Sequence, residues 1–254
     1  SPGCKLLVRG GLERMPIGNS GVGSSWVTPD KQVTLGALLS LQHIIAKNAI
    51  ANRKRKWPQA PTTYCHIDAY AGDGSMREGV PGSPVVFMDA IAKTDMEFRA
   101  SFVDEVRANT FALDRLVGDD GRYTVHTGDC AVFVPRILES VPRHAIGLLY
   151  CDPNGWPDIE MVQKAARMRP KIDILLRLPA TARKRQIGNA RYRCVDPPPN
   201  LAGDIASVEK KLWIVRGPID GDAWHWMFLF GTNYTDFPAW RKHGFVFMDT
   251  KAGQ

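Results

Sequence analysis

The spacing of hydrophobic residues changes repeatedly along the chain between the period of a helix and that of a strand, which predicts an α/β protein. A helix is expected from Thr28, which can cap it, to the basic run at residues 53–56. Residues 145–151 form a continuous apolar run, typical of a strand covered on both faces in a parallel sheet. Four more parallel strands are predicted at residues 64–68, 98–103, 123–126 and 172–178. Helices are predicted at 82–91, at 131–138 and at 158–168, and one more follows the strand at 98–103 and ends at about 116.

The last part of the chain lacks this alternation. Residues 224–230 and 245–248 are predicted as strands, and residues 208–215 fit either a helix or a strand. Strands without long helices between them pair antiparallel. We therefore expect a three-layer α-β-α sandwich with a mostly parallel sheet and an antiparallel edge. One domain is predicted over residues 26–254, after a glycine-rich irregular arm at residues 1–25.

Composition narrows the class of protein only slightly. With 254 residues, of which 44% are hydrophobic, the chain can bury one sizeable core. Neither an apolar run of about 20 residues nor a signal-peptide pattern is found, so we expect a cytoplasmic protein with no membrane segment. The five cysteines include no C-x-x-C pair and indicate neither a disulfide framework nor a zinc site. A net charge of +7 suits a polyanionic partner such as nucleic acid, although charge alone is a weak criterion.

Acidic residues follow the first three predicted strands: Asp68, Asp104 and Asp129. Ligands of open parallel sheets bind beyond the carboxyl ends of the strands, and Gly72 and Gly74 allow the backbone to approach a ligand there. We interpret Asp68 as the partner of a cationic group, Asp104 as an acceptor for ribose hydroxyls and Asp129 as an acceptor for an adenine amine. Together they predict S-adenosylmethionine as the cofactor. For each acid, capping of a helix is the alternative.

The segment Asp68-x-Tyr70-x-Gly72-x-Gly74 is similar to the D-x-F-x-G-x-G motif of nucleic-acid methyltransferases, with tyrosine in place of the usual phenylalanine. Together with the Gly-Ser-Pro at 82–84 and the Tyr-Cys-Asp-Pro-Asn-Gly-Trp at 150–156, it resembles the bacterial three-Cys-motif partner proteins, a methyltransferase-like family. The resemblance covers about residues 26–190. It implies a Rossmann-like methyltransferase fold, with these motif residues, Tyr70 included, at the cofactor.

Asp152, Pro153 and Asn154 stand where amino-methyltransferases carry D-P-P-Y or N-P-P-Y. In that motif a carboxylate or amide and the proline carbonyl accept both hydrogens of an exocyclic base amine, while the aromatic ring stacks on the flipped base. We expect Asp152 and the Pro153 carbonyl to orient the nucleophile in this way. Asn154 replaces the second proline, and Trp156 stands one place later than the usual aromatic residue. A tight turn with Asp152 as a helix cap is the alternative.

Three basic residues are predicted to contact a phosphate backbone: Arg177 within the last parallel strand, and Arg183 and Arg185 just after it. The basic run at 53–56 fits such a role and a solvated helix end equally well. The sequence thus predicts an S-adenosylmethionine-dependent methyltransferase that acts on nucleic acid at a base amine, with DNA or RNA and the oligomeric state left open. Alternatives are a non-catalytic module that binds nucleic acid or a protein, and, less favoured because no third glycine follows Gly74 at the expected place, a nicotinamide-dependent oxidoreductase.

Overall fold

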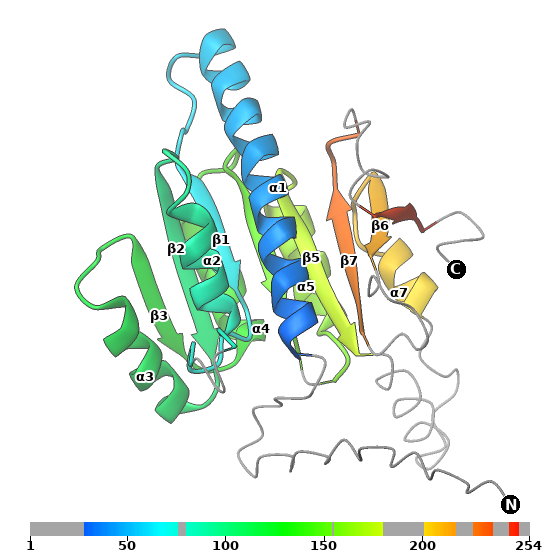
Figure 1. The fold of residues 1–254 in the computed structure, drawn as a ribbon. Coiled ribbons are helices and arrows are strands. Elements are labelled where there is room, and N and C mark those ends of the chain that lie inside the picture. The colour runs from blue at the N-terminus through cyan, green and yellow to red at the C-terminus, as the bar shows by residue number, and fades with distance from the viewer. Residues whose placement is uncertain are drawn as a thin grey trace, which may run out of the picture.

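A sheet of eight strands, in the order β3-β2-β1-β4-β5-β7-β6-β8, organises the molecule (Figure 1). The structure, a computed structural model, describes residues 28–75, 80–153, 155–179, 201–216, 226–235 and 244–248. The predicted arm at 1–25, Asn154, Arg183 and Arg185 lie outside these ranges. Five strands are parallel: β1 (Tyr64–Asp68), β2 (Phe98–Asp104), β3 (Tyr123–Thr127), β4 (Ile146–Cys151) and β5 (Ile172–Pro179).

The antiparallel edge consists of β7 (Trp226–Thr232), β6 (Leu212–Arg216) and β8 (Val246–Phe247). The segment 208–215, which the hydrophobic pattern left undecided, contains most of strand β6. It follows a short helix, α7 (Leu201–Ala206), that was not predicted. The late part of the chain therefore supplies three strands rather than two, and the predicted α/β sandwich with an antiparallel edge is confirmed.

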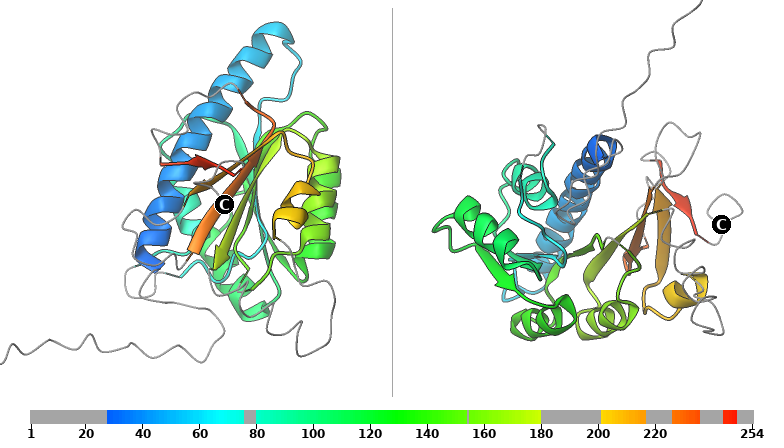
Figure 2. Two further views of the ribbon diagram at one scale, coloured as in Figure 1. Left: turned by 90° about the vertical axis from the view of Figure 1, so that its right-hand side faces the viewer. Right: turned by 90° about the horizontal axis from the view of Figure 1, so that it is seen from below.

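Helices cover both faces of the sheet (Figure 2). On one face, α1 (Thr28–Lys56), α2 (Ser83–Ile91) and α3 (Arg107–Val117) share a hydrophobic core with the sheet. On the other, α4 (Cys130–Ser140), α5 (Ile159–Met168) and α7 share a second core. Proline near the start of α2 and the side chains of Asp129 and Asp158 at the starts of α4 and α5 fix where these helices begin.

Helix α1 is held against the middle of the sheet by a buried glutamine. Gln42 accepts a hydrogen bond from the Tyr64 hydroxyl (2.7 Å) and donates one to the Gly147 carbonyl (3.3 Å). By length and hydropathy alone this helix could cross a membrane, since residues Asp30–Lys56 include a window of mean hydropathy 1.2. However, 44% of that window is buried inside the molecule, and core helices pass the same test. Its packing places the first turn of α1 beside the carboxyl ends of β1 and β4.

The order of the strands reverses next to β1, because β2 follows it on one side and β4 lies on the other. In open α/β sheets, ligands bind in the crevice that opens at such a switch point, beyond the carboxyl ends of the strands. In Figure 1 this is the lower edge of the sheet. The acids predicted from the sequence at the ends of β1, β2 and β4 all lie along this edge.

Candidate active site

The turn after β1 owes its shape to two glycines in the left-handed region of backbone conformation. Gly72 has φ 65° and Gly74 has φ 66°. A Cβ atom on Gly72 would meet nothing within 4 Å, so only its conformation favours glycine. A Cβ atom on Gly74 would lie 2.9 Å from Leu116 Cδ2 and 3.0 Å from Leu113 Cδ1. An added Cβ atom at 74 would therefore make the ends of these two side chains shift, in addition to the cost of the left-handed conformation.

Asp104, at the end of β2, joins this turn to the start of α3. Its Oδ2 accepts from the Gly72 N–H at 2.9 Å, and its Oδ1 accepts from the Val106 N–H at 2.9 Å and from Asn109 Nδ2 at 3.0 Å. A carboxylate offers about four lone-pair sites, so one on Oδ2 is left for a further donor. The side chain is half-buried. Its predicted contact with ribose hydroxyls stays a prediction.

Asp68, the last residue of β1, is completely buried. Its Oδ2 accepts from the Ser83 hydroxyl at 2.6 Å, and its Oδ1 accepts from the Tyr70 N–H at 3.1 Å. Burial raises the pKa of Asp68, and the two hydrogen bonds lower it by less. The nearby charges of Asp152 and Asp104 also raise it, so that the pKa is about 7. Asp68 thus changes charge near neutral pH, and a cation beside it would favour the ionised form.

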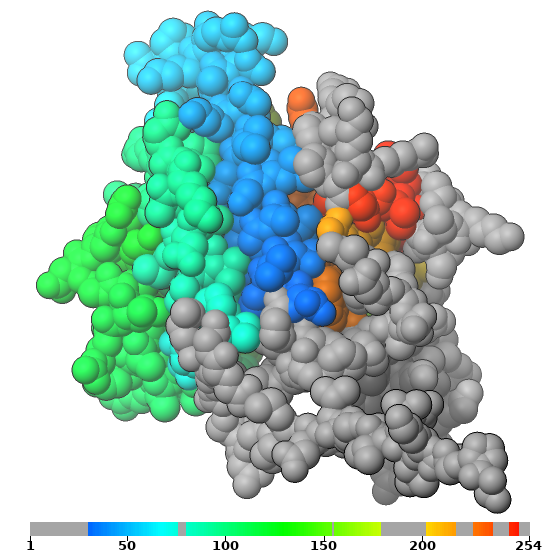
Figure 3. Space-filling model, viewed as in Figure 1, coloured from blue at the N-terminus to red at the C-terminus, as the bar shows by residue number. Residues whose placement is uncertain are grey.

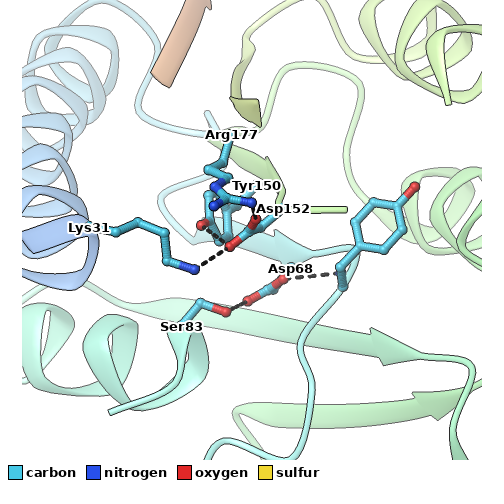
Figure 4. A network of polar contacts seen from close by, with 7 residues as sticks. Lys31, Asp68, Ser83, Tyr150, Asp152 and Arg177 are labelled. Carbon is cyan, nitrogen blue, oxygen red and sulfur yellow. Dashed lines mark hydrogen bonds and ion pairs between the residues drawn. The ribbon is translucent and has the colours of Figure 1, made fainter. Parts of the chain in front are cut away.

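Beyond β4, Asp152 is the centre of a polar network (Figure 4). Lys31 Nζ, from the first turn of α1, lies 2.8 Å from Asp152 Oδ2, and Arg177 Nη1, from β5, lies 3.3 Å from Oδ1. The Tyr150 hydroxyl donates to Oδ2 at 3.1 Å. The side chains of Lys31, Asp152 and Arg177 are only 11%, 14% and 14% exposed. Three separate elements therefore converge on this one carboxylate.

Burial raises the pKa of Asp152, but the charges of Lys31 and Arg177 and the hydrogen bonds from Lys31 and Tyr150 outweigh it, so that the pKa falls below its usual value. The pKa of Tyr150 rises well above its usual value because the ring is buried and Asp152 and Asp68 are close. At neutral pH Asp152 is consequently a fixed anion that accepts hydrogen bonds, and it is not a proton acceptor. Tyr150 stays protonated as its donor.

The remaining predicted residues are engaged with the protein. Asp129 is exposed and caps α4, because its Oδ1 accepts from the Ala131 N–H at 2.7 Å, which is the capping alternative named above. Trp156 donates from its indole N–H to Asp204 Oδ2 at 3.2 Å, which ties it to α7. Tyr70 is half-buried and Pro153 is buried. Arg177 lies within β5, as the sequence predicted, and pairs with Asp152. Its predicted contact with a phosphate backbone stays a prediction.

Three members of the network were not identified from the sequence: Lys31, Ser83 and Tyr150. Ser83 and Tyr150 stand within the motifs that suggested the family resemblance, but their roles as donors to Asp68 and Asp152 depend on the packing of α2 and β4. Lys31 has no local signal at all, since it lies 121 positions before Asp152.

The strand order and the glycine turn beside the switch point define the class of fold: the chain is an open, mostly parallel, Rossmann-like α/β sandwich. A scan of protein-family models found no match, and neither did a search of curated proteins. Among solved structures, protein LPL1258 from Legionella pneumophila is similar, with a TM-score of 0.54 and 13% identity over 85% of this chain and 89% of that chain. At this identity the similarity supports the fold alone.

Two more distant structures are a methyltransferase from Geobacter sulfurreducens and the fibrillarin of Aeropyrum pernix with natively bound S-adenosyl-L-methionine. The first has a TM-score of 0.47 and 14% identity over 78% of both chains. The second has a TM-score of 0.43 and 18% identity over 72% of this chain and 74% of that chain. Both scores are too low to carry an argument about activity. The narrower resemblance to three-Cys-motif partner proteins rests on the sequence motifs.

Proposed function

We propose that the protein is an S-adenosylmethionine-dependent methyltransferase that acts on nucleic acid, with a base exocyclic amine as the acceptor. One observation carries the proposal: a buried carboxyl group with a pKa near 7, Asp68, lies at the switch point of the sheet, between a glycine turn and the ion-paired Asp152. The carboxylate that we assign to the cofactor would then stand beside the one that we assign to the acceptor.

The residues around the glycine turn fit the proposed cofactor. Ionised Asp68 would accept from the ammonium group of the methionine part, and the remaining lone pair of Asp104 would accept from a ribose hydroxyl. The backbone of the turn at Gly72 is open, with nothing within 4 Å of an added Cβ atom. When bound, the cofactor supplies a methyl group on a positively charged sulfur.

The proposed acceptor contacts follow from the hydrogen-bond sites of Asp152. Three of its roughly four lone-pair sites are taken by Lys31, Tyr150 and Arg177, which leaves one on Oδ1. This site and the Pro153 carbonyl would accept the two hydrogens of an amine, which favours the pyramidal nitrogen that attacks a methyl group. Because Asp152 is ionised, it would orient the amine, and the released proton must leave by another route.

A second candidate is a methyltransferase-like module that binds nucleic acid or a protein partner without transfer. The 2.8 Å contact of Lys31 with Asp152 favours this second candidate. Lys31 and Tyr150 together occupy both lone pairs of Asp152 Oδ2, which leaves that oxygen no site for an acceptor. The two candidates differ in whether an acceptor amine can bind beside Asp152 while Lys31 remains there.

Calorimetry with S-adenosylmethionine and with its demethylated product tests the cofactor class. Binding that is lost in Asp68→Ala and kept in Asp114→Asn, a control that changes an exposed acid on α3, supports the proposal. Absence of binding of either compound at millimolar concentration would overturn it. Binding without incorporation of a labelled methyl group into DNA or RNA would favour the non-catalytic module.

A further inference from the structure

The edge of the sheet opposite the candidate active site is lined with basic side chains. They come from the last turn of α1 and from the turns that precede β4, β5 and β6, where the strands begin. We call this set the amino-edge surface; its members are Arg53, Lys54, Arg55, Lys56, Arg143, Arg169, Lys171, Lys210 and Lys211. Figures 1 and 3 show the end of α1 standing clear of the upper edge of the sheet.

Hydrogen bonds show that these segments meet. Arg53 donates from Nη1 to the His144 carbonyl, in the turn before β4. Arg169, before β5, donates from Nε to the Val141 carbonyl at 2.8 Å, in that same turn. Lys210, before β6, donates from Nζ to the carbonyl of Ile172 at 2.6 Å. The four segments that carry these basic residues therefore lie next to one another at this edge.

The nine positive charges of the amino-edge surface outnumber the acids close to them along the chain. Within the described residues, none of its nine basic side chains forms an ion pair with a carboxylate. Glu209, next to Lys210, and Asp173, two positions after Lys171, are the acids nearest to it along the chain, and the charge of Asp173 partly offsets the lowering of the Lys210 pKa by burial. Burial and the charge of Arg53 both lower the pKa of Lys171, so at least one pair of these cations repels. A surface of this kind gains free energy when a polyanion releases its counterions on binding.

Two further residues indicate which polyanion fits. Arg53 is only 7% exposed and forms no ion pair within the described residues, so its buried charge adds to the positive potential of this edge. Trp57, the next residue after the basic run, is 62% exposed. An exposed indole beside a row of cations is the combination with which proteins bind single-stranded nucleic acid, because the ring stacks on unpaired bases while the cations follow the backbone.

We infer that the amino-edge surface is a binding site for single-stranded nucleic acid, separate from the candidate active site. At about 1.5 Å per residue, the 29 residues of α1 extend roughly 40 Å, from the first turn beside the candidate active site to the basic run at the other end of the helix. The surface therefore does not contribute to the transfer site. Binding there requires no cofactor, and the inference stands or falls independently of methyl transfer.

Fluorescence anisotropy with labelled single-stranded and duplex oligonucleotides, without cofactor and at several salt concentrations, tests this inference. In the triple variant Lys54→Gln/Arg55→Gln/Lys56→Gln we expect at least tenfold weaker binding of single strands. The slope of log K against log salt should fall in magnitude by about 2, given ~0.7 per phosphate contact. Trp57→Ala should weaken binding about tenfold and leave the salt slope unchanged, because it removes stacking alone.

A matched control removes the same charge elsewhere, by Arg107→Gln/Arg115→Gln/Arg136→Gln at exposed positions on α3 and α4. It should change the affinity less than threefold, and thermal melting should show that all variants fold. An equal loss in this control would overturn the inference, because a general charge effect would then explain binding. Absence of binding at about 50 mM salt, or tighter binding of duplex than of single strands, would overturn it as well.

Discussion

Lys31 and Asp152 lie 121 positions apart in the sequence, yet Lys31 Nζ is 2.8 Å from Asp152 Oδ2. The pair joins the first turn of α1 to the carboxyl end of β4, so it holds a covering helix in place and fixes the central carboxylate of the candidate site at the same time. Arg177 completes the pair from β5, at 3.3 Å from the other carboxylate oxygen.

Removal of the lysine charge should therefore destabilise the protein. We expect Lys31→Met to lower the free energy of unfolding by about 2 kcal/mol, because it leaves a mostly buried carboxylate with one fewer partner. Urea denaturation of Lys31→Met, Asp152→Asn and the double variant measures the coupling. Additive effects of the two substitutions would contradict an energetic link between these residues.

Asp152→Asn should separate transfer from cofactor binding. The amide keeps the shape of the side chain but loses the charge that the two cations surround, and its NH₂ group would face either those cations or the acceptor amine. We expect unchanged affinity for the demethylated product and at least a hundredfold loss of methyl incorporation. Asp114→Asn serves as the control. Transfer at the original rate in Asp152→Asn would exclude the orienting role.

The strand-end acids were predictable, because the carboxyl ends of parallel strands meet at one edge and each acid stands at or just after the end of a predicted strand. The group that each acid contacts was harder to predict. Asp129 precedes a helix as well as following a strand, and only the structure shows that it caps α4. Lys31 could not have been found, since helical periodicity places it on α1 without saying which strand end the helix meets. The pattern at 208–215 was ambiguous because a turn and a short strand fall within one apolar window.

The two glycines of the turn should differ in their sensitivity to alanine. At Gly72 the substitution meets open space and costs about 1–2 kcal/mol through its left-handed backbone alone. At Gly74 the new methyl group would also displace the ends of the Leu113 and Leu116 side chains, which adds a smaller cost. Chemical denaturation should thus rank Gly74→Ala as the less stable variant. The reverse order would show that α3 does not pack on the turn as described.

The free energy of unfolding should depend on pH because of Asp68. Its pKa is raised from 3.8 to about 7 in the folded state, so the folded protein binds more protons than the unfolded chain between these values. This contribution to stability is present below about pH 4 and is lost as the pH rises to about 7, with a total of up to ~4 kcal/mol. The amide side chain in Asp68→Asn does not titrate in this range. The stability of this variant relative to the wild type should increase from pH 5 to pH 8, and a constant difference would contradict the raised pKa.

The same carboxyl group makes cofactor binding depend on pH in the opposite direction. If ionised Asp68 accepts from the ammonium group of the cofactor, the affinity for the demethylated product follows the ionised fraction, which rises about tenfold between pH 6 and pH 8 around a pKa of about 7. Calorimetric titrations at pH 6, 7 and 8 measure this rise. In Asp68→Asn the affinity should be weak and independent of pH, whereas Asp114→Asn should behave as the wild type does. Equal pH dependence in the wild type and Asp68→Asn would assign the effect to the ligand or to another group, and would remove Asp68 from the cofactor site.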